Sequence, residues 1–184
     1  MKVAPCREIK PKKSGGFTLI EFGIVVALIA IAVVGIYSFY QARKNSSGVS
    51  ETAQELVMIG ARAQKLYSDQ PSFTGVTAAV LINNGIVPAN MVSGTTIRTK
   101  WNTTVAVGAG TLNTAGDALS LTVPVQPKSC SDFVQEAAAG SAKVTVGGQV
   151  VKDIVSGVDN LVIGTLGTAC SGNGNVNVAL LIGR

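Results

Sequence analysis

The pattern of apolar and polar residues changes sharply near residue 40. From Phe17 to Tyr40 the chain is almost continuously apolar, and Glu21 is the only charged side chain in this stretch. A helix of about 20 apolar residues is long enough to cross a lipid bilayer. The pattern therefore predicts a membrane-length helix with one carboxylate near its start.

Beyond residue 44 the apolar positions become periodic. They recur at the i, i+3, i+4, i+7 spacing that is typical of an amphipathic helix. Residues 45–48, Asn-Ser-Ser-Gly, are poor helix formers and form the weak point of this segment. We expect the helix to run on to about residue 70 and to end at Pro71. Its predicted buried stripe consists of Ala53, Leu56, Val57, Gly60, Ala63 and Tyr67.

Two short helices are predicted after Pro71. Residues 74–84 read as a helix that stops at Gly85, since glycine is common just after a helix end. Residues 129–139 read as another helix, with Ser129 or Ser131 as its N-cap.

The rest of the chain is rich in Val, Thr, Ile and Leu, which favours strands. Alternation predicts a mainly antiparallel sheet with one covered face. That face is expected to pack on the helical stripe of residues 51–67, which makes an α+β head. The expected strands are residues 95–107, 119–125, 143–151 and 176–182, with glycine-rich breaks at 108–110, 147–148 and 171–174.

The positive charge of the chain is concentrated at its start. Residues 1–16 carry five Lys or Arg residues and one Glu, whereas the remainder has ten basic and nine acidic residues, a formal charge of +1. A basic segment before an apolar one is typical of a membrane-targeted N-terminus. We interpret residues 1–16 as a cleavable leader, with an uncleaved cytoplasmic tail as the alternative. The nearly neutral remainder gives no indication of a nucleic-acid site.

The candidate chemistry is sparse. The chain has no histidine, which removes the commonest general base and metal ligand. The acids Asp117, Asp132, Glu136, Asp153 and Asp159 are scattered without metal-loop spacing. We therefore expect no cofactor, no metal site and no enzymatic activity, because an exported enzyme would need a catalytic constellation that the sequence lacks.

Glu21 has two interpretations. An acid at a helix start interacts favourably with the helix dipole. Alternatively, because a carboxylate within a membrane costs a few kcal/mol, it pairs with a cation from another subunit. Cleavage before Phe17 would supply such a cation, since a new α-amino group is largely protonated at neutral pH.

The segment Gly16-Phe17-Thr18-Leu19-Ile20-Glu21, together with the basic leader and the apolar helix, resembles the prepilin signature of type IV pilins. The resemblance implies that a prepilin peptidase cleaves between Gly16 and Phe17 and methylates the new N-terminus at Phe17. It also implies that Glu21 is the assembly residue. The short helix predicted at residues 74–84, directly after the long one, and the 16-residue leader favour the class b pilins, whereas Phe17 is typical of class a.

The resemblance also implies an architecture. After the leader, residues 17–44 form the hydrophobic helix that serves as membrane anchor and filament core, and residues 45–184 form the head. The implied partners are other copies in a helical filament, the prepilin peptidase, and inner-membrane assembly machinery with a separate ATPase. The protein would lie in the bacterial inner membrane before assembly and in an extracellular pilus afterwards.

The cysteines fit an exported head. Cys6 leaves with the leader, and Cys130 and Cys170 remain. In an oxidising compartment we expect these two to form a disulfide, with two unpaired buried thiols as the alternative. In pilins such a bridge delimits the region of partner contacts, here residues 131–169.

Three functional hypotheses remain open. The first is a structural pilin that serves adhesion, aggregation, motility or cell–cell contact. The second is a related pseudopilin of type II secretion, although many of these bind calcium and this chain has no clustered acidic loop. The third is a membrane-anchored binding module that never polymerises.

Overall fold

A computed structural model describes the backbone of residues 19–184 and the side chains of residues 19–37 and 48–184. The expectations for the leader, Gly16 and Phe17 lie outside the described residues. The chain divides into two compact units, Met1–Gln41 and Ala42–Arg184, and each is described by itself.

The long helix α1 (Leu19–Leu66) includes the segment that the sequence marks as weak. At that point the Thr52 hydroxyl donates to the Gly48 carbonyl at 2.8 Å, a bond that the helix geometry allows. The predicted end at Pro71 is wrong, because the helix stops at Leu66. The guanidinium of Arg184 donates to the Ser68 and Pro71 carbonyls at 3.1 and 3.0 Å, which holds this stretch outside the helix.

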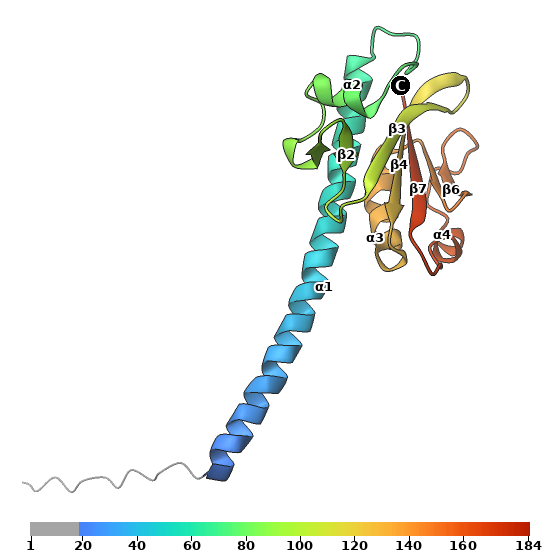
Figure 1. The fold of residues 1–184 in the computed structure, drawn as a ribbon. Coiled ribbons are helices and arrows are strands. Elements are labelled where there is room, and N and C mark those ends of the chain that lie inside the picture. The colour runs from blue at the N-terminus through green and yellow to red at the C-terminus, as the bar shows by residue number, and fades with distance from the viewer. Residues whose placement is uncertain (1–18) are drawn as a thin grey trace, which may run out of the picture. The chain divides into compact units, whose positions relative to one another are not determined.

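The head contains a seven-stranded antiparallel sheet with the order β1-β2-β3-β4-β7-β5-β6 (Figure 1). Strands β4 and β7 lie near its centre and pair over their whole shared length. Strands β1 and β6 form the two edges. The strands are β1 (Val92–Ser93), β2 (Thr96–Arg98), β3 (Thr104–Thr111), β4 (Ala115–Val125), β5 (Lys143–Val146), β6 (Gln149–Asp153) and β7 (Val176–Gly183).

The predicted strand 95–107 is two strands, because a turn separates β2 from β3. Asn102 adopts φ 64° in this turn, and its side-chain oxygen accepts a hydrogen bond from Arg98 at 2.7 Å. Asparagine tolerates this left-handed conformation better than most residues. The predicted break at 108–110 is also wrong, since Gly108 and Gly110 lie inside β3 and pair with Ser120 and Ala118 of β4.

Asp117 closes the actual turn between β3 and β4. Its carboxylate accepts hydrogen bonds from the backbone N–H groups of Leu112, Asn113 and Thr114 at 2.7–2.8 Å. These bonds, led by that of Leu112, lower the pKa of Asp117 from 3.8 to about 2. A lowered pKa favours the folded turn at neutral pH, and this contribution is lost as the pH falls through that interval.

The predicted strand 143–151 is a hairpin of β5 and β6. Gly147 and Gly148 form its turn with φ values of 56° and 85°, a conformation that glycine adopts without steric cost. The glycine-rich break expected at 147–148 is therefore confirmed. The strands predicted at 119–125 and 176–182 are also confirmed, the first with four additional residues at its start.

The short helices differ from the predictions at their ends. Helix α2 (Ala78–Asn83) begins later than residue 74, and the Thr77 hydroxyl accepts from the Val80 amide at 3.3 Å as its N-cap. Helix α3 (Pro127–Ala137) has Pro127 in its first turn, so the serine N-caps are wrong. Helix α4 (Ile163–Ala169) was not predicted. Two single-turn 3₁₀ helices, Ala89–Met91 and Ala138–Gly140, complete the helical elements of the described chain.

The α+β head is confirmed, because one core joins the α1 stripe to the sheet. Ala53, Leu56 and Ala63 of the predicted stripe are fully buried, and they lie in one cluster with the inward-facing residues of β4, β5 and β7. Ile59, which was not predicted, is also fully buried, whereas Val57 and Tyr67 are only half-buried. Trp101 packs against this core half-buried, and its indole N–H donates to the Pro124 carbonyl at 3.1 Å.

Gly60 lets α1 approach β7 closely. A Cβ at this position would lie 2.1 Å from Cδ1 of Ile182, a side chain that is itself buried. Close packing leaves little room for such an atom, and overpacking a core costs about 1–3 kcal/mol. The glycine is therefore a packing requirement of the head and not a flexible point of the helix.

We predict that Gly60→Ala lowers the free energy of unfolding relative to a matched control, Gly167→Ala. Both glycines lie in helices, so both substitutions gain helix propensity, but a Cβ at Gly167 meets no atom within 4 Å. The difference between the two variants should be about 1–3 kcal/mol. Denaturant unfolding of the detergent-solubilised chain measures it, and equal stability of the two variants would contradict the packing role.

Candidate functional site: the apolar N-terminal segment

The first functional feature is the apolar part of α1. Leu19–Tyr37 has a mean hydropathy of 2.8 over 19 residues and is long and apolar enough to cross a membrane. Every residue in this span is exposed, from Leu19 at 90% to Val25 at 42% among the large apolar side chains. A helix that is apolar on all sides is typical of a membrane span or of the centre of an assembly.

Exposure of this segment to water is energetically untenable. Burying one large aliphatic or aromatic side chain gains about 1.5–3 kcal/mol, and the segment carries such residues in every turn. No part of the described segment is buried by the chain itself. Lipid or other apolar helices are the surroundings in which such a segment is stable.

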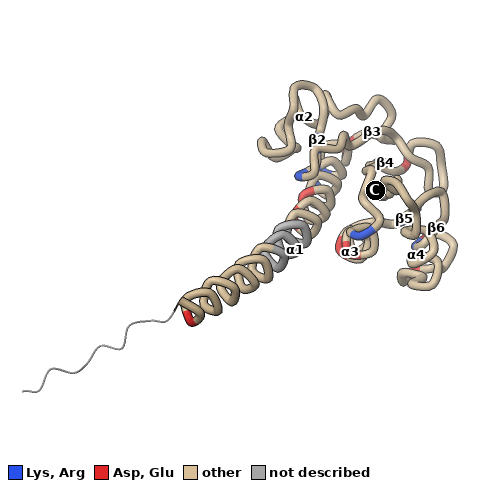
Figure 2. The backbone as a smooth tube through the Cα atoms, turned by 60° about the horizontal axis from the view of Figure 1, so that its bottom comes forward, with Lys and Arg blue, Asp and Glu red and all other residues tan. Residues whose placement is uncertain are grey.

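Glu21 lies in the first turn of α1, where its side chain is exposed. It is the only Asp, Glu, Lys or Arg in Leu19–Tyr37, and the described apolar part of the helix is red in Figure 2 only at its beginning. The helix dipole favours a carboxylate at this end. The predicted processing residues, Gly16 and Phe17, lie outside the described residues. The spacing of four residues from Phe17 to Glu21 is therefore known from the sequence alone.

The predicted disulfide is confirmed. Cys130 in α3 and Cys170, the C-cap of α4, are bonded with a Cα–Cα distance of 5.7 Å. Both are buried in the core cluster. The bond fixes α4 to the head, and it encloses the β5–β6 hairpin and the loop that follows.

The region between the two cysteines carries an exposed apolar surface that sequence reasoning missed. The amide of Val162 donates to the Val151 carbonyl at 2.9 Å, and Asp153 pairs with Val158, so the loop after β6 folds back along this edge strand. Val and Ile recur through this region of the sequence. This recurrence could have indicated an exposed apolar surface, but it is equally typical of buried core strands. The exposed side chains are Val150, Ile154, Val155, Val158, Val162 and Ile163.

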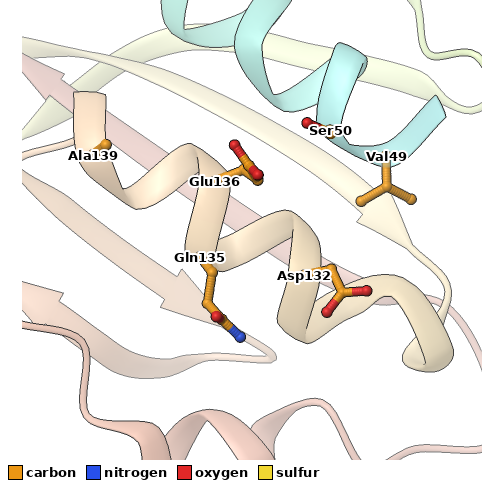
Figure 3. Close-up of a pocket in the computed structure, with 6 residues that line it drawn as sticks. All are labelled: Val49, Ser50, Asp132, Gln135, Glu136 and Ala139. Carbon is orange, nitrogen blue, oxygen red and sulfur yellow. The ribbon is translucent and has the colours of Figure 1, made fainter. Parts of the chain in front are cut away.

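A groove of about 430 Å³ lies between α3 and the head portion of α1 (Figure 3). Asp132 and Glu136 lie one turn apart on α3, and Glu136 is on the side that faces Val49 and Ser50. The groove is lined by the carboxylates of Asp132 and Glu136 and by the hydroxyl of Ser50. Among residues 19–184, no group of three or more His, Cys, Asp or Glu side chains is placed to hold a metal ion.

The solved structures that resemble this chain define the class of its fold. TcpA, a type IV pilin from Vibrio cholerae El Tor biotype, aligns with a TM-score of 0.58 and 15% identity over 73% of this chain and 98% of that chain. The type IV b pilin from Salmonella typhi aligns with a TM-score of 0.58 and 13% identity over 73% and 99%. The fold is that of a type IV pilin.

The sequence comparison identifies the family. The profile described as PilS N terminal matches residues 46–182, which is most of the head. The chain belongs to the PilS family of type IV b pilins, a family of structural pilins and not of enzymes. The resemblance noted from the leader and the apolar helix is thus confirmed from a different part of the chain.

Two relatives support this assignment. The major structural subunits of bundle-forming pilus from Escherichia coli O127:H6 (strain E2348/69 / EPEC) and from Escherichia coli O111:H- are each 30% identical over 114 residues. The match covers 60% of this chain and 59% of the length of each relative.

Proposed function

We propose that the mature chain is the structural subunit of a type IV pilus that assembles through its N-terminal helix. The observation that carries the proposal is the segment Leu19–Tyr37, which is apolar on all sides and exposed, and whose single acid, Glu21, lies in its first turn. Lipid covers this segment before assembly, and the same segments of other copies cover it in the filament. The relatives, major subunits of a bundle-forming pilus, support this role.

Two opposite charges, the α-amino group of Phe17 and the carboxylate of Glu21, drive the assembly of subunits. After cleavage between Gly16 and Phe17, the α-amino group of Phe17 is cationic at neutral pH. Glu21 of a neighbouring copy compensates that charge inside the helix bundle, where an unpaired charge is costly. A pair between copies places each charge beside its opposite inside the bundle, and this attraction favours the filament.

The subunit has partners in the membrane and occupies two locations in turn. A prepilin peptidase removes residues 1–16, and inner-membrane machinery with a separate ATPase drives assembly. The subunit lies in the bacterial inner membrane before assembly, and the head becomes part of an extracellular filament. Such a filament serves adhesion, aggregation, motility or cell–cell contact. The E. coli relatives are subunits of a bundle-forming pilus, and this favours a role in which filaments associate with one another.

Mass spectrometry of the N-terminal peptide tests the processing step. We expect the protein purified from its own cells to begin at a methylated Phe17, with Gly16 and all preceding residues absent. Protein from cells without the prepilin peptidase should retain Met1 and is the control. An intact Met1 in the normal cells would contradict the proposal and favour a membrane-anchored binding module.

A further inference from the structure

The chain contains two Asn-Gly pairs, Asn84-Gly85 and Asn173-Gly174. Asparagine before glycine is chemically reactive, because glycine has no Cβ and its backbone reaches conformations that other residues avoid. The glycine nitrogen can then attack the asparagine side-chain amide. The fold places the two pairs in very different environments, so the sequence alone does not tell which one reacts.

The first pair is held at the end of α2. Asn84 is the C-cap, and its side-chain amide donates to the Val80 carbonyl at 2.8 Å. The Gly85 amide donates to the Ile82 carbonyl at 2.9 Å, and Gly85 has φ 67°. The nucleophile and the leaving amide are thus both fixed by hydrogen bonds, which must open before they can react.

The second pair lies in an exposed loop between the disulfide and β7. Residues 171–175 are all exposed, and strand pairing resumes only at Val176. Within the described chain, neither the Asn173 side chain nor the Gly174 amide forms a hydrogen bond to another residue. A Cβ on Gly174 would meet nothing within 4 Å, so the space beside this residue is open.

We infer that Asn173 is a deamidation site of the folded protein and that Asn84 is protected. The backbone nitrogen of Gly174 bonds to Cγ of Asn173, and the Cγ–Nδ2 bond breaks. Ammonia leaves with the proton of the attacking amide, and a five-membered imide remains. One water molecule then opens either carbonyl of the imide, which yields aspartate or isoaspartate without any change of oxidation state.

The modification alters the charge of the exposed head. Residues 45–184, which form the head, carry eight Lys or Arg and eight Asp or Glu residues, a formal charge of zero. This count rests on the leader being removed, as proposed above, only in that residues 1–16 are left out. A carboxylate at position 173 changes the charge of the head to −1, so heads in an old filament carry a net negative charge that newly made heads lack. The chemistry itself does not depend on cleavage or on assembly.

Peptide mapping of the full chain, kept folded in detergent at mildly alkaline pH, tests the inference. After reduction, trypsin places Asn84 in the peptide of residues 66–98 and Asn173 in the peptide of residues 153–184. We expect the acid and isoaspartate forms to accumulate at Asn173, with Asn84 about tenfold or more slower, because two hydrogen bonds must first open. In guanidinium with reductant the two rates should converge.

Gly174→Ala is the matched variant, because a Cβ fits at this position and the φ is not left-handed. It should leave the fold intact and slow the reaction at Asn173 severalfold, since alanine restricts the backbone. Equal rates at the two asparagines in the folded chain would overturn the inference, as would an unchanged rate at Asn173 in a folded Gly174→Ala variant. Neither result bears on filament formation.

Discussion

Glu21→Ala should abolish or nearly abolish filaments while leaving stable protein in the membrane. Glu21 is the only charged residue of Leu19–Tyr37, so its loss makes membrane insertion easier and not harder. In the filament, the same change leaves the α-amino group of Phe17 without its proposed partner in an apolar bundle. Removal of one member of a buried ion pair costs about 3–5 kcal/mol, and in a filament this cost recurs at every subunit.

Electron microscopy and sheared-pilus yield measure the effect, with membrane-fraction protein as the reference. Glu21→Gln keeps the size of the side chain and isolates the charge, and it should assemble nearly as poorly as the alanine variant. Asp69→Ala removes an exposed acid of the head outside residues 131–169 and should assemble normally. Normal yield from Glu21→Ala would contradict charge compensation, whereas absence of the variant from the membrane would point to a role in insertion.

Much of the functional segment could be predicted from the sequence, because its signals are local. The uninterrupted apolar run and the single acid depend only on residue type, and the structure adds that the described segment is exposed on all sides. The spacing between Phe17 and Glu21 is likewise a property of the chain. Which atoms they meet in a filament depends on other copies, and no single chain can specify this.

The strand boundaries could not be predicted equally well, because a strand depends on its neighbours. The local sequence does not distinguish Gly108 from Gly147. In the structure, Gly108 pairs with Ser120 inside β3, whereas Gly147 adopts φ 56° in a turn. The difference lies in β4, whose continuous pairing holds Gly108 extended. Local propensity does not include such a cross-strand partner.

Helix α4 was missed for a related reason. Gly164 and Gly167 lie within its seven residues, and glycine lowers helix propensity by about 1 kcal/mol relative to alanine. Tertiary contacts provide the stability instead: Leu166 is 1% exposed, and Cys170 at its end is bonded to α3. The sequence predicted the bond but not the helix that the bond fixes.

This dependence of α4 on the bond leads to the second large effect, on the stability of the head. The disulfide joins residues 40 positions apart, and the loop-closure relation gives a stabilisation of about 4 kcal/mol for a loop of this length. We therefore expect the double variant Cys130→Ala, Cys170→Ala to lose about that much free energy of unfolding. A typical domain has only about 5–15 kcal/mol in total, so the head would become marginal.

Guanidinium unfolding of the detergent-solubilised chain, followed by tryptophan fluorescence of Trp101, measures this loss. Gly167→Ala, which changes α4 but leaves the bond intact, is the control and should be at least as stable as the unaltered protein. Hydrogen exchange should show that the lost protection is greatest in α4, since Cys170 is its C-cap, and smaller in β4 and β7, which pair without it. A double variant as stable as the control would mean that the packing of Leu166 alone holds α4 to the head.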